Sequence, residues 1–271
     1  MSRDKGDIRA LQDRAMTALA RYGYLTLPQM QRLKVGVIGN SRPEMNLLID
    51  WKYVKVLKYT TTDLRKHPYW YFLTPLGASI YQDRNREVTD IVYPKHTRDV
   101  VRMDYLHRVN FVDTWISYDE WIAKNNHTTE FFYPYYHFRG KERATKLHLN
   151  DGSVIVPDGV LCFNKGKQRL YHLEVFRGDN TKNIVDKAAK ISQAIAQGVA
   201  AIHYKKETAE RGLFTFEHEG TMKATMSRIL ESDIYKKGLE DYLFFALAKD
   251  VQTDFGKWIK LTGEVVDLAL V

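Results

Sequence analysis

Two carboxylate residues in the middle of the sequence have the type and placement that metal-dependent phosphate chemistry requires. Asp158 opens one expected strand, and Glu174 lies near the end of the next. A hairpin of these strands would bring both carboxylates onto neighbouring strands, where they repel each other unless a cation is present. Hard divalent ions accept oxygen ligands of this kind, retain water and hold phosphate groups. We therefore expect Asp158 and Glu174 to bind Mg²⁺ or Mn²⁺ as catalytic groups.

An ordinary structural role for both residues is the alternative. Asp158 precedes Gly159, and Asp-Gly is typical of turns. Glu174 would then be a strand residue in a salt bridge. The choice between the two interpretations depends on whether the fold brings the carboxylates together.

The elements that must position these residues follow from the hydrophobic pattern of the C-terminal two thirds. It predicts a long amphipathic helix over 100–122, a hairpin of 147–149 with 154–156, and a second hairpin of 160–163 with 170–176. Helices over 183–201 and 221–230 alternate with strands at 214–216 and 242–247. This order predicts an α/β domain with a mixed sheet over 100–271.

The N-terminal third has a different pattern. It predicts a helix over 7–22, a second capped by Thr26, and a third that begins at Ser41 with Ser41 and Glu44 as a capping box and Pro43 in its first turn. Strands at 53–57 and 69–72 and a closing helix that ends at Tyr81 follow. We expect a winged helix-turn-helix domain over 1–86, joined by a linker over 87–99.

The charge distribution indicates what this first domain binds. Residues 1–86 hold 15 Lys and Arg against 7 Asp and Glu, whereas the remaining residues hold 26 against 26. A basic domain beside a neutral one favours a polyanion partner, and we expect double-stranded DNA. The alternative is a winged helix that contacts another protein and whose lysines are merely solvated. The third helix of such a domain enters the major groove, and the wing touches phosphates. The contact candidates are Arg42, Asn46, Lys52, Lys55, Lys58, Arg65 and Lys66.

An aromatic segment at 131–140 is followed by further cations. Together Arg139, Lys141, Arg143 and the aromatic rings could bind single-stranded DNA by stacking and charge neutralisation. The alternative is a packed aromatic strand with a solvated loop. Tyr133, Tyr135 and Tyr136 are also candidates for a covalent tyrosyl route, although most tyrosines in a sheet-rich domain are packing residues.

Composition excludes several classes of protein. With 44% hydrophobic and 27% charged residues, the 271-residue chain is not a collagen, a coiled coil, a disordered chain or a disulfide scaffold. Its single cysteine, Cys162, has no partner in the chain, and we see neither a leader nor a long apolar run. We expect a cytoplasmic protein that does not enter a membrane.

Read as Pro157-Asp158 and Glu174-Val175-Phe176, the acidic hairpin resembles the motif of the PD-(D/E)xK nuclease superfamily. The order of "YFLTPLGASIY", "HRVNFVD", "PDG" and "EVFRG" more specifically resembles the replication-relaxation family, which includes the C-class plasmid mobilisation relaxases. The resemblance implies a restriction-endonuclease-like domain and metal-dependent nicking of DNA. It also implies partners in a relaxosome or another mobile-element complex.

One departure from that pattern concerns the third catalytic place, two residues after the glutamate. This residue is usually Lys in the superfamily and often another acid in the replication-relaxation family, but here it is Phe176. We expect Lys187 or Lys190, which share one face of the following helix, to supply the missing charge. Asp179 is another substitute, and Asp104 or His107 could add a metal ligand. The solvated helix surface is the alternative for both lysines.

Other catalytic schemes find little support. The chain has no His-x-His pair, nucleophile elbow or phosphate-cradling glycine loop. The leading hypothesis is a sequence-directed, metal-dependent DNA nicking enzyme of a plasmid or other mobile element. Its rival is a DNA-binding replication or transcription factor with a degenerate nuclease fold, and a third interpretation is a cleaving subunit of a transposase or defence complex.

Overall fold

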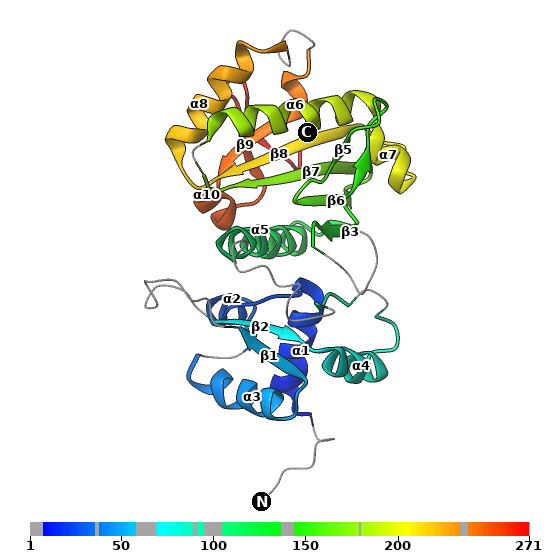
Figure 1. Cartoon of the computed structure of the whole chain (residues 1–271), viewed down its shortest axis with the longest axis vertical. Coiled ribbons are helices and arrows are strands. Elements are labelled where there is room, and N and C mark those ends of the chain that lie inside the picture. Colours follow the sequence, from blue (N-terminus) through cyan, green and yellow to red (C-terminus); the bar gives the residue numbers. More distant parts are fainter. Residues whose placement is uncertain are drawn as a thin grey trace, which may run out of the picture. The chain divides into compact units, whose positions relative to one another are not determined.

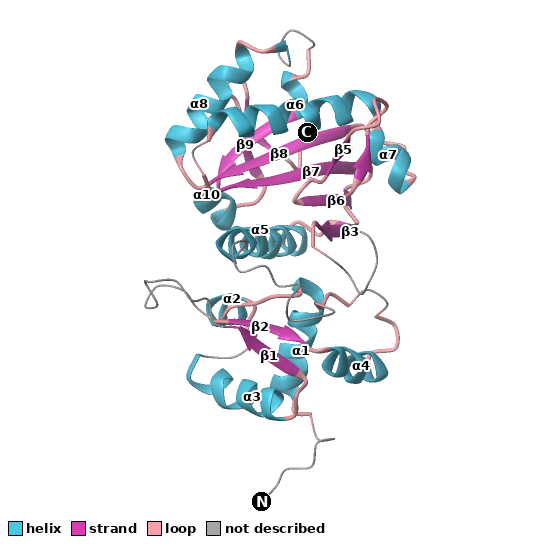
Figure 2. Cartoon of the chain, in the orientation of Figure 1, coloured by secondary structure: helices cyan, strands magenta, loops and turns pink. Residues whose placement is uncertain are grey.

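The computed structural model describes residues 8–35, 38–57, 69–88, 91–94, 105–136, 144–178, 180–233 and 238–270 (Figure 1). They form two compact units, of which the first extends to Val112 and the second begins at Asp113. Each unit is a mixture of helices and strands (Figure 2). No helix within these ranges is long and apolar enough to cross a membrane.

The first unit contains helices and one small hairpin, in the order that the sequence predicted. Its elements are α1 (Ala10–Tyr22), α2 (Leu27–Arg32), α3 (Ile38–Asp50), β1 (Val54–Leu57), β2 (Trp70–Leu73) and α4 (Pro75–Arg84). The hairpin is antiparallel, with Val54 opposite Leu73. Thr26 caps α2 by accepting from the backbone N–H of Gln29, as expected.

The predicted start of α3 is wrong. The helix begins at Ile38 rather than after Ser41, so that Pro43 lies inside it. The side chain of Ser41 is not described. The carboxylate of Glu44 accepts a hydrogen bond from Gln12 Nε2 at 2.9 Å and lies 3.4 Å from the Arg9 guanidinium, both next to or within α1. Glu44 therefore joins α3 to α1 by a tertiary contact.

The helix α5 (Tyr105–Lys124) begins in the first unit. The ring of Tyr105 lies 4.3 Å from that of Trp70, and the guanidinium of Arg108 lies 4.5 Å above the ring of Tyr24. These contacts explain why the division between the units falls inside α5, whereas the sequence placed it in the connector at 87–99. The first turns of the helix share the core of the N-terminal elements.

A seven-stranded mixed sheet forms the centre of the second unit, with the order β11-β10-β9-β8-β7-β6-β3. Strands β7, β8 and β9 are parallel, and the remaining neighbours are antiparallel. The strands are β3 (Thr128–Pro134), β6 (Gly159–Asn164), β7 (Gln168–Phe176), β8 (Glu210–Phe216), β9 (Leu243–Leu247), β10 (Lys257–Lys260) and β11 (Val265–Asp267).

Helices cover both faces of this sheet. Alternate residues of β6 point to opposite faces, so Cys162 joins the core beneath α6 (Thr181–Gln197) while Phe163 packs against Trp121 of α5 at 5.2 Å. The α6 face also carries α7 (Val199–Tyr204) and α8 (Glu219–Leu230), and α10 (Ala248–Thr253) follows β9. The mixed α/β architecture predicted from the sequence is confirmed.

A separate hairpin of β4 (Leu147–His148) and β5 (Val154–Ile155) forms where the sequence predicted it, with Gly152 at φ +81° in its turn. One other expectation is wrong, and two strands were missed. The helix expected over 183–201 ends at Gly198, whose φ of +63° breaks it into α6 and α7. Strands β10 and β11 were not predicted, because their short alternation is weak without the neighbouring strand.

Candidate active site

The hairpin of β6 and β7 brings the two predicted carboxylates together. Gly159 pairs with Leu173, so Asp158 lies beside the end of β7 where Glu174 and Val175 follow. Asp158 Oδ2 accepts a hydrogen bond from the backbone N–H of Val175 at 2.8 Å. The carboxylate of Asp158 is therefore fixed to the strand that carries Glu174, as the hairpin prediction requires.

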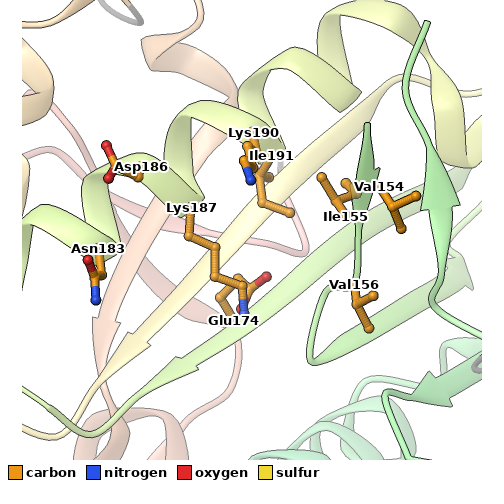
Figure 3. A pocket seen from close by; sticks show the side chains of 9 residues that line it. All are labelled: Val154, Ile155, Val156, Glu174, Asn183, Asp186, Lys187, Lys190 and Ile191. Carbon is orange, nitrogen blue, oxygen red and sulfur yellow. The ribbon is translucent and has the colours of Figure 1, made fainter. Parts of the chain in front are cut away.

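Lys187 reaches both carboxylates from α6, and Figure 3 shows its side chain extending from the helix to Glu174. Its ammonium contacts Glu174 Oε2 and lies 3.7 Å from Asp158 Oδ1. The sequence predicted that either Lys187 or Lys190 would point back to this pair, and that placement is confirmed for Lys187. The helical period explains why Lys187 and not Lys190 points to the pair. Lys187 borders the apolar stripe of Ile184 and Ile191, whereas Lys190 lies about 60° further from that stripe around the helix axis.

Phe176 occupies the strand position at which the motif has a lysine. Its ring stacks on that of Phe214 with centroids 6.2 Å apart and joins the core between the sheet and α6. The Lys187 ammonium lies 6.0 Å from the Phe176 ring centroid. The helix thus places a positive charge beside the Phe176 ring.

The charges of this group are strongly coupled. The side chain of Glu174 is fully buried, and burial together with the neighbouring charge of Asp158 raises its pKa well above the ordinary value. Burial opposes the charge of Lys187, but the attraction of Glu174 and Asp158 outweighs it and raises the pKa of the ammonium. A protonated Glu174 beside an ionised Asp158 and Lys187 would leave the group neutral overall.

A pocket of about 350 Å³ opens above these charges, with Glu174 and Lys187 among its lining residues. Its other walls come from α6 and from the end of the β4–β5 hairpin, and they include Asn183, Asp186, Lys190, Ile191, Val154, Ile155 and Val156. Lys190 is exposed and forms no ion pair with a residue in the described ranges. Glu174 and Lys187 therefore border a space large enough for a small ligand.

The donor set fits a divalent cation held by two protein carboxylates. Glu174 Oε1 is buried and has no hydrogen-bond partner within the described residues, which is costly for a carboxylate unless a cation or a proton satisfies it. Mg²⁺ is commonly bound by one or two carboxylates with water and substrate phosphate. The described ranges contain no cluster of three or more His, Cys, Asp or Glu side chains that could hold a metal alone.

Three further predicted residues stay predictions as groups of this site. Asp104 and Asp179 lie outside the described residues, and His107 belongs to the first unit, whereas the pocket lies in the second.

The predicted DNA contacts are described only in part. Asn46 of α3, Lys52 after it and Lys55 of β1 are exposed in the first unit. The side chain of Arg42 is not described, and Lys58, Arg65, Lys66, Arg139, Lys141 and Arg143 lie outside the described residues.

The described part of the aromatic segment is a packed strand, as the structural alternative expected. The ring of Tyr133 stacks on Phe131 at 4.6 Å and lies 5.7 Å from the ring of Tyr204. Tyr136 is 5% exposed. The rings of Phe131, Tyr133 and Tyr204 pack against one another, and that of Tyr136 is buried, so these rings are less accessible for stacking on DNA bases.

A buried contact between a histidine and a glutamate of neighbouring strands was not predicted from the sequence. His172 Nε2 lies 2.6 Å from Glu210 Oε2, and the other carboxylate oxygen of Glu210 accepts from the backbone N–H of Ala201 at 2.7 Å. Both side chains are almost completely buried. The signal that could have found it was His172 two residues before Glu174, which places both on one face of an otherwise apolar strand.

Comparisons with family models, curated proteins and solved structures each found no significant match to this chain.

Proposed function

We propose that this protein is a metal-dependent DNA endonuclease that nicks one strand and is directed to its site by its N-terminal unit. In this proposal the helices and the small hairpin of the first unit form a winged helix-turn-helix. The second unit is a PD-(D/E)xK-type nuclease domain with its lysine moved to α6. The observation that carries the proposal is the convergence of Asp158, Glu174 and Lys187 from separate elements at one pocket.

Each of these side chains has a distinct task in the proposed reaction. Asp158 and Glu174 would hold Mg²⁺ or Mn²⁺, which supplies a more acidic bound water and neutralises charge on the phosphate. The Val175 N–H orients the carboxylate of Asp158. Lys187 keeps its proton, because both carboxylates stabilise its charge, and it offers that charge to the scissile phosphate as negative charge develops there.

The first unit would supply the site selection. Its share of the net charge, the exposed Lys52 and Lys55, and the helix α3 before the hairpin support contacts with duplex DNA. The likeness to mobilisation relaxases favours a role at a plasmid or other mobile element, with relaxosome-type proteins as partners. Phosphate contacts of this kind give affinity, and groove contacts from α3 would give sequence preference.

Nicking of supercoiled plasmid in the presence of Mn²⁺ tests the proposal. We expect Asp158→Asn and Glu174→Gln to abolish the nicked product and to weaken Mn²⁺ binding in calorimetry, because each removes one of two anionic ligands. Lys187→Met should lower nicking by about 10²-fold or more, as expected for loss of one preorganised charge. Glu219→Gln, at an exposed carboxylate of α8, is the matched control and should behave as the parent.

The rival function is a DNA-binding replication or transcription factor that keeps the nuclease fold as a scaffold. Phe176 in the third motif place favours it, since Lys187 and Glu174 could then be a structural ion pair. This function would be supported if the parent protein bound duplex DNA tightly and in a salt-dependent way but neither nicked plasmid nor bound Mn²⁺.

A further inference from the structure

The pocket beside Asp158 and Glu174 has two chemically different walls (Figure 3). Val154, Ile155 and Val156 provide an aliphatic surface on one side, and α6 provides Lys187 and Lys190 on the other. A cleavage site that needed only to touch a backbone phosphate would not require an aliphatic wall. This combination suits a ligand that has a flat apolar part and an anionic part.

The aliphatic wall is held in place by its own hairpin. The backbone N–H of Asn150 donates to Gln197 Oε1 at 2.9 Å, and Gln193 Nε2 donates to Asp151 Oδ2 at 3.0 Å. Both glutamines belong to α6, so the turn of the hairpin is tied to the helix that forms the opposite wall. Ile155 is buried and anchors the hairpin in the core, while Val154 remains 39% exposed.

The charges around the pocket leave one cation available for an anionic group. Lys187 is engaged by the two carboxylates, whereas Lys190 forms no ion pair within the described ranges. Asp186, one turn earlier on α6, also lines the pocket, but Figure 3 draws its carboxylate pointing away from the valines. Lys190 therefore offers a positive charge at the helix wall of the pocket to an anionic group of a ligand.

We infer that this pocket binds a single unpaired nucleotide of the DNA strand, with its base against Val154 and Val156 and its phosphate at Lys190. The inference rests on the proposed function, because it gives that site its substrate class. A volume of about 350 Å³ is at the small end of ligand pockets. A base that is stacked and paired cannot enter such a space, so the strand must be single or the nucleotide must be turned out of the duplex.

The test is the affinity of the full-length protein for a fluorescein-labelled oligothymidylate of about five nucleotides, measured by anisotropy in EDTA so that no cleavage occurs. Val154→Asp and Lys190→Ala should each weaken binding at least 10-fold, within the range expected for loss of one base or phosphate contact. Val265→Asp, at an exposed valine of β11, and Lys182→Ala, at an exposed lysine of α6, should change it less than 2-fold. Affinity for a blunt duplex should be the same in all four variants.

The outcomes separate this inference from the proposed function. If the parent nicks plasmid but all four variants bind the oligonucleotide equally, the pocket does not hold a nucleotide and the inference is wrong while the nuclease proposal stands. If no nicking occurs but only the two pocket variants lose affinity, the pocket inference stands without the nuclease. If the two pocket variants lost equal affinity for duplex and for single strand, the inference would also be wrong, because the pocket residues would then contribute only non-specific electrostatic attraction to DNA.

Discussion

Replacing Lys187 with Met tests the charge balance of the site through stability alone. Methionine keeps most of the apolar stem and removes the ammonium, so the change isolates the charge. Breaking a fully buried ion pair costs about 3 to 5 kcal/mol. The Lys187 side chain is 37% exposed, so solvent screens part of this interaction. Glu174 can also take up a proton. We therefore expect the free energy of unfolding to fall by about 1 to 3 kcal/mol at pH 8.

The pH dependence of this loss has a definite sign. Burial raises the pKa of Glu174 in the folded protein above its ordinary value of 4.5. The stability that comes from the protonated carboxyl is therefore fully present below pH 4.5 and is lost as the pH rises through the folded pKa. Removing the ammonium raises that pKa further, so Lys187→Met should cost more at pH 8 than at pH 5. The slope is at most about 1.4 kcal/mol per pH unit for one proton.

Urea unfolding of the parent and variants at pH 5 and pH 8 measures both quantities. Lys190→Ala is the control and should stay within about 0.5 kcal/mol of the parent, because Lys190 is exposed. We expect the double variant Lys187→Met/Glu174→Gln to be destabilised by at least about 1 kcal/mol less than the sum of the two single losses, since the two side chains are in contact. Equal, pH-independent losses for Lys187→Met and Lys190→Ala would refute the coupling of Lys187 to the two carboxylates.

Three further predictions concern the framework and the first unit. Glu210→Ala should lower the free energy of unfolding by about 2 to 4 kcal/mol, because it leaves the buried His172 and the backbone N–H of Ala201 without their acceptor. A loss below about 1 kcal/mol would show that water replaces the carboxylate. Gly77→Ala should cost about 3 kcal/mol or more in thermal unfolding, since its Cβ would lie 1.9 Å from Tyr53 O. Gly220→Ala, which meets nothing within 4 Å in α8, should be neutral or stabilising. Lys55→Ala should reduce, by about one, the slope of the logarithm of the duplex-binding constant against the logarithm of the salt concentration. An unchanged slope would show that Lys55 does not contact the duplex.

The sequence by itself determined the features that depend on local chain chemistry. The Asn150-Asp151-Gly152 turn predicted its hairpin, because that turn needs the positive φ that Gly152 adopts. The two apolar runs at 160–163 and 170–176, with a turn between them, predicted two antiparallel strands, and their register makes Asp158 a neighbour of Glu174. The helical period on which Lys187 and Lys190 lie predicted that a lysine could turn toward the sheet.

Only the tertiary structure decided which groups act together at the pocket. Lys187 meets the carboxylates because α6 packs over β7 with Ile184 and Ile191 inward, and no local pattern specifies how far along the strand that helix lies. The pairing of His172 with Glu210 depends on the parallel register of β7 and β8, whose partners are separated by a whole crossover in the sequence. Such contacts arise from packing between distant segments, and packing has no periodic signal in the chain.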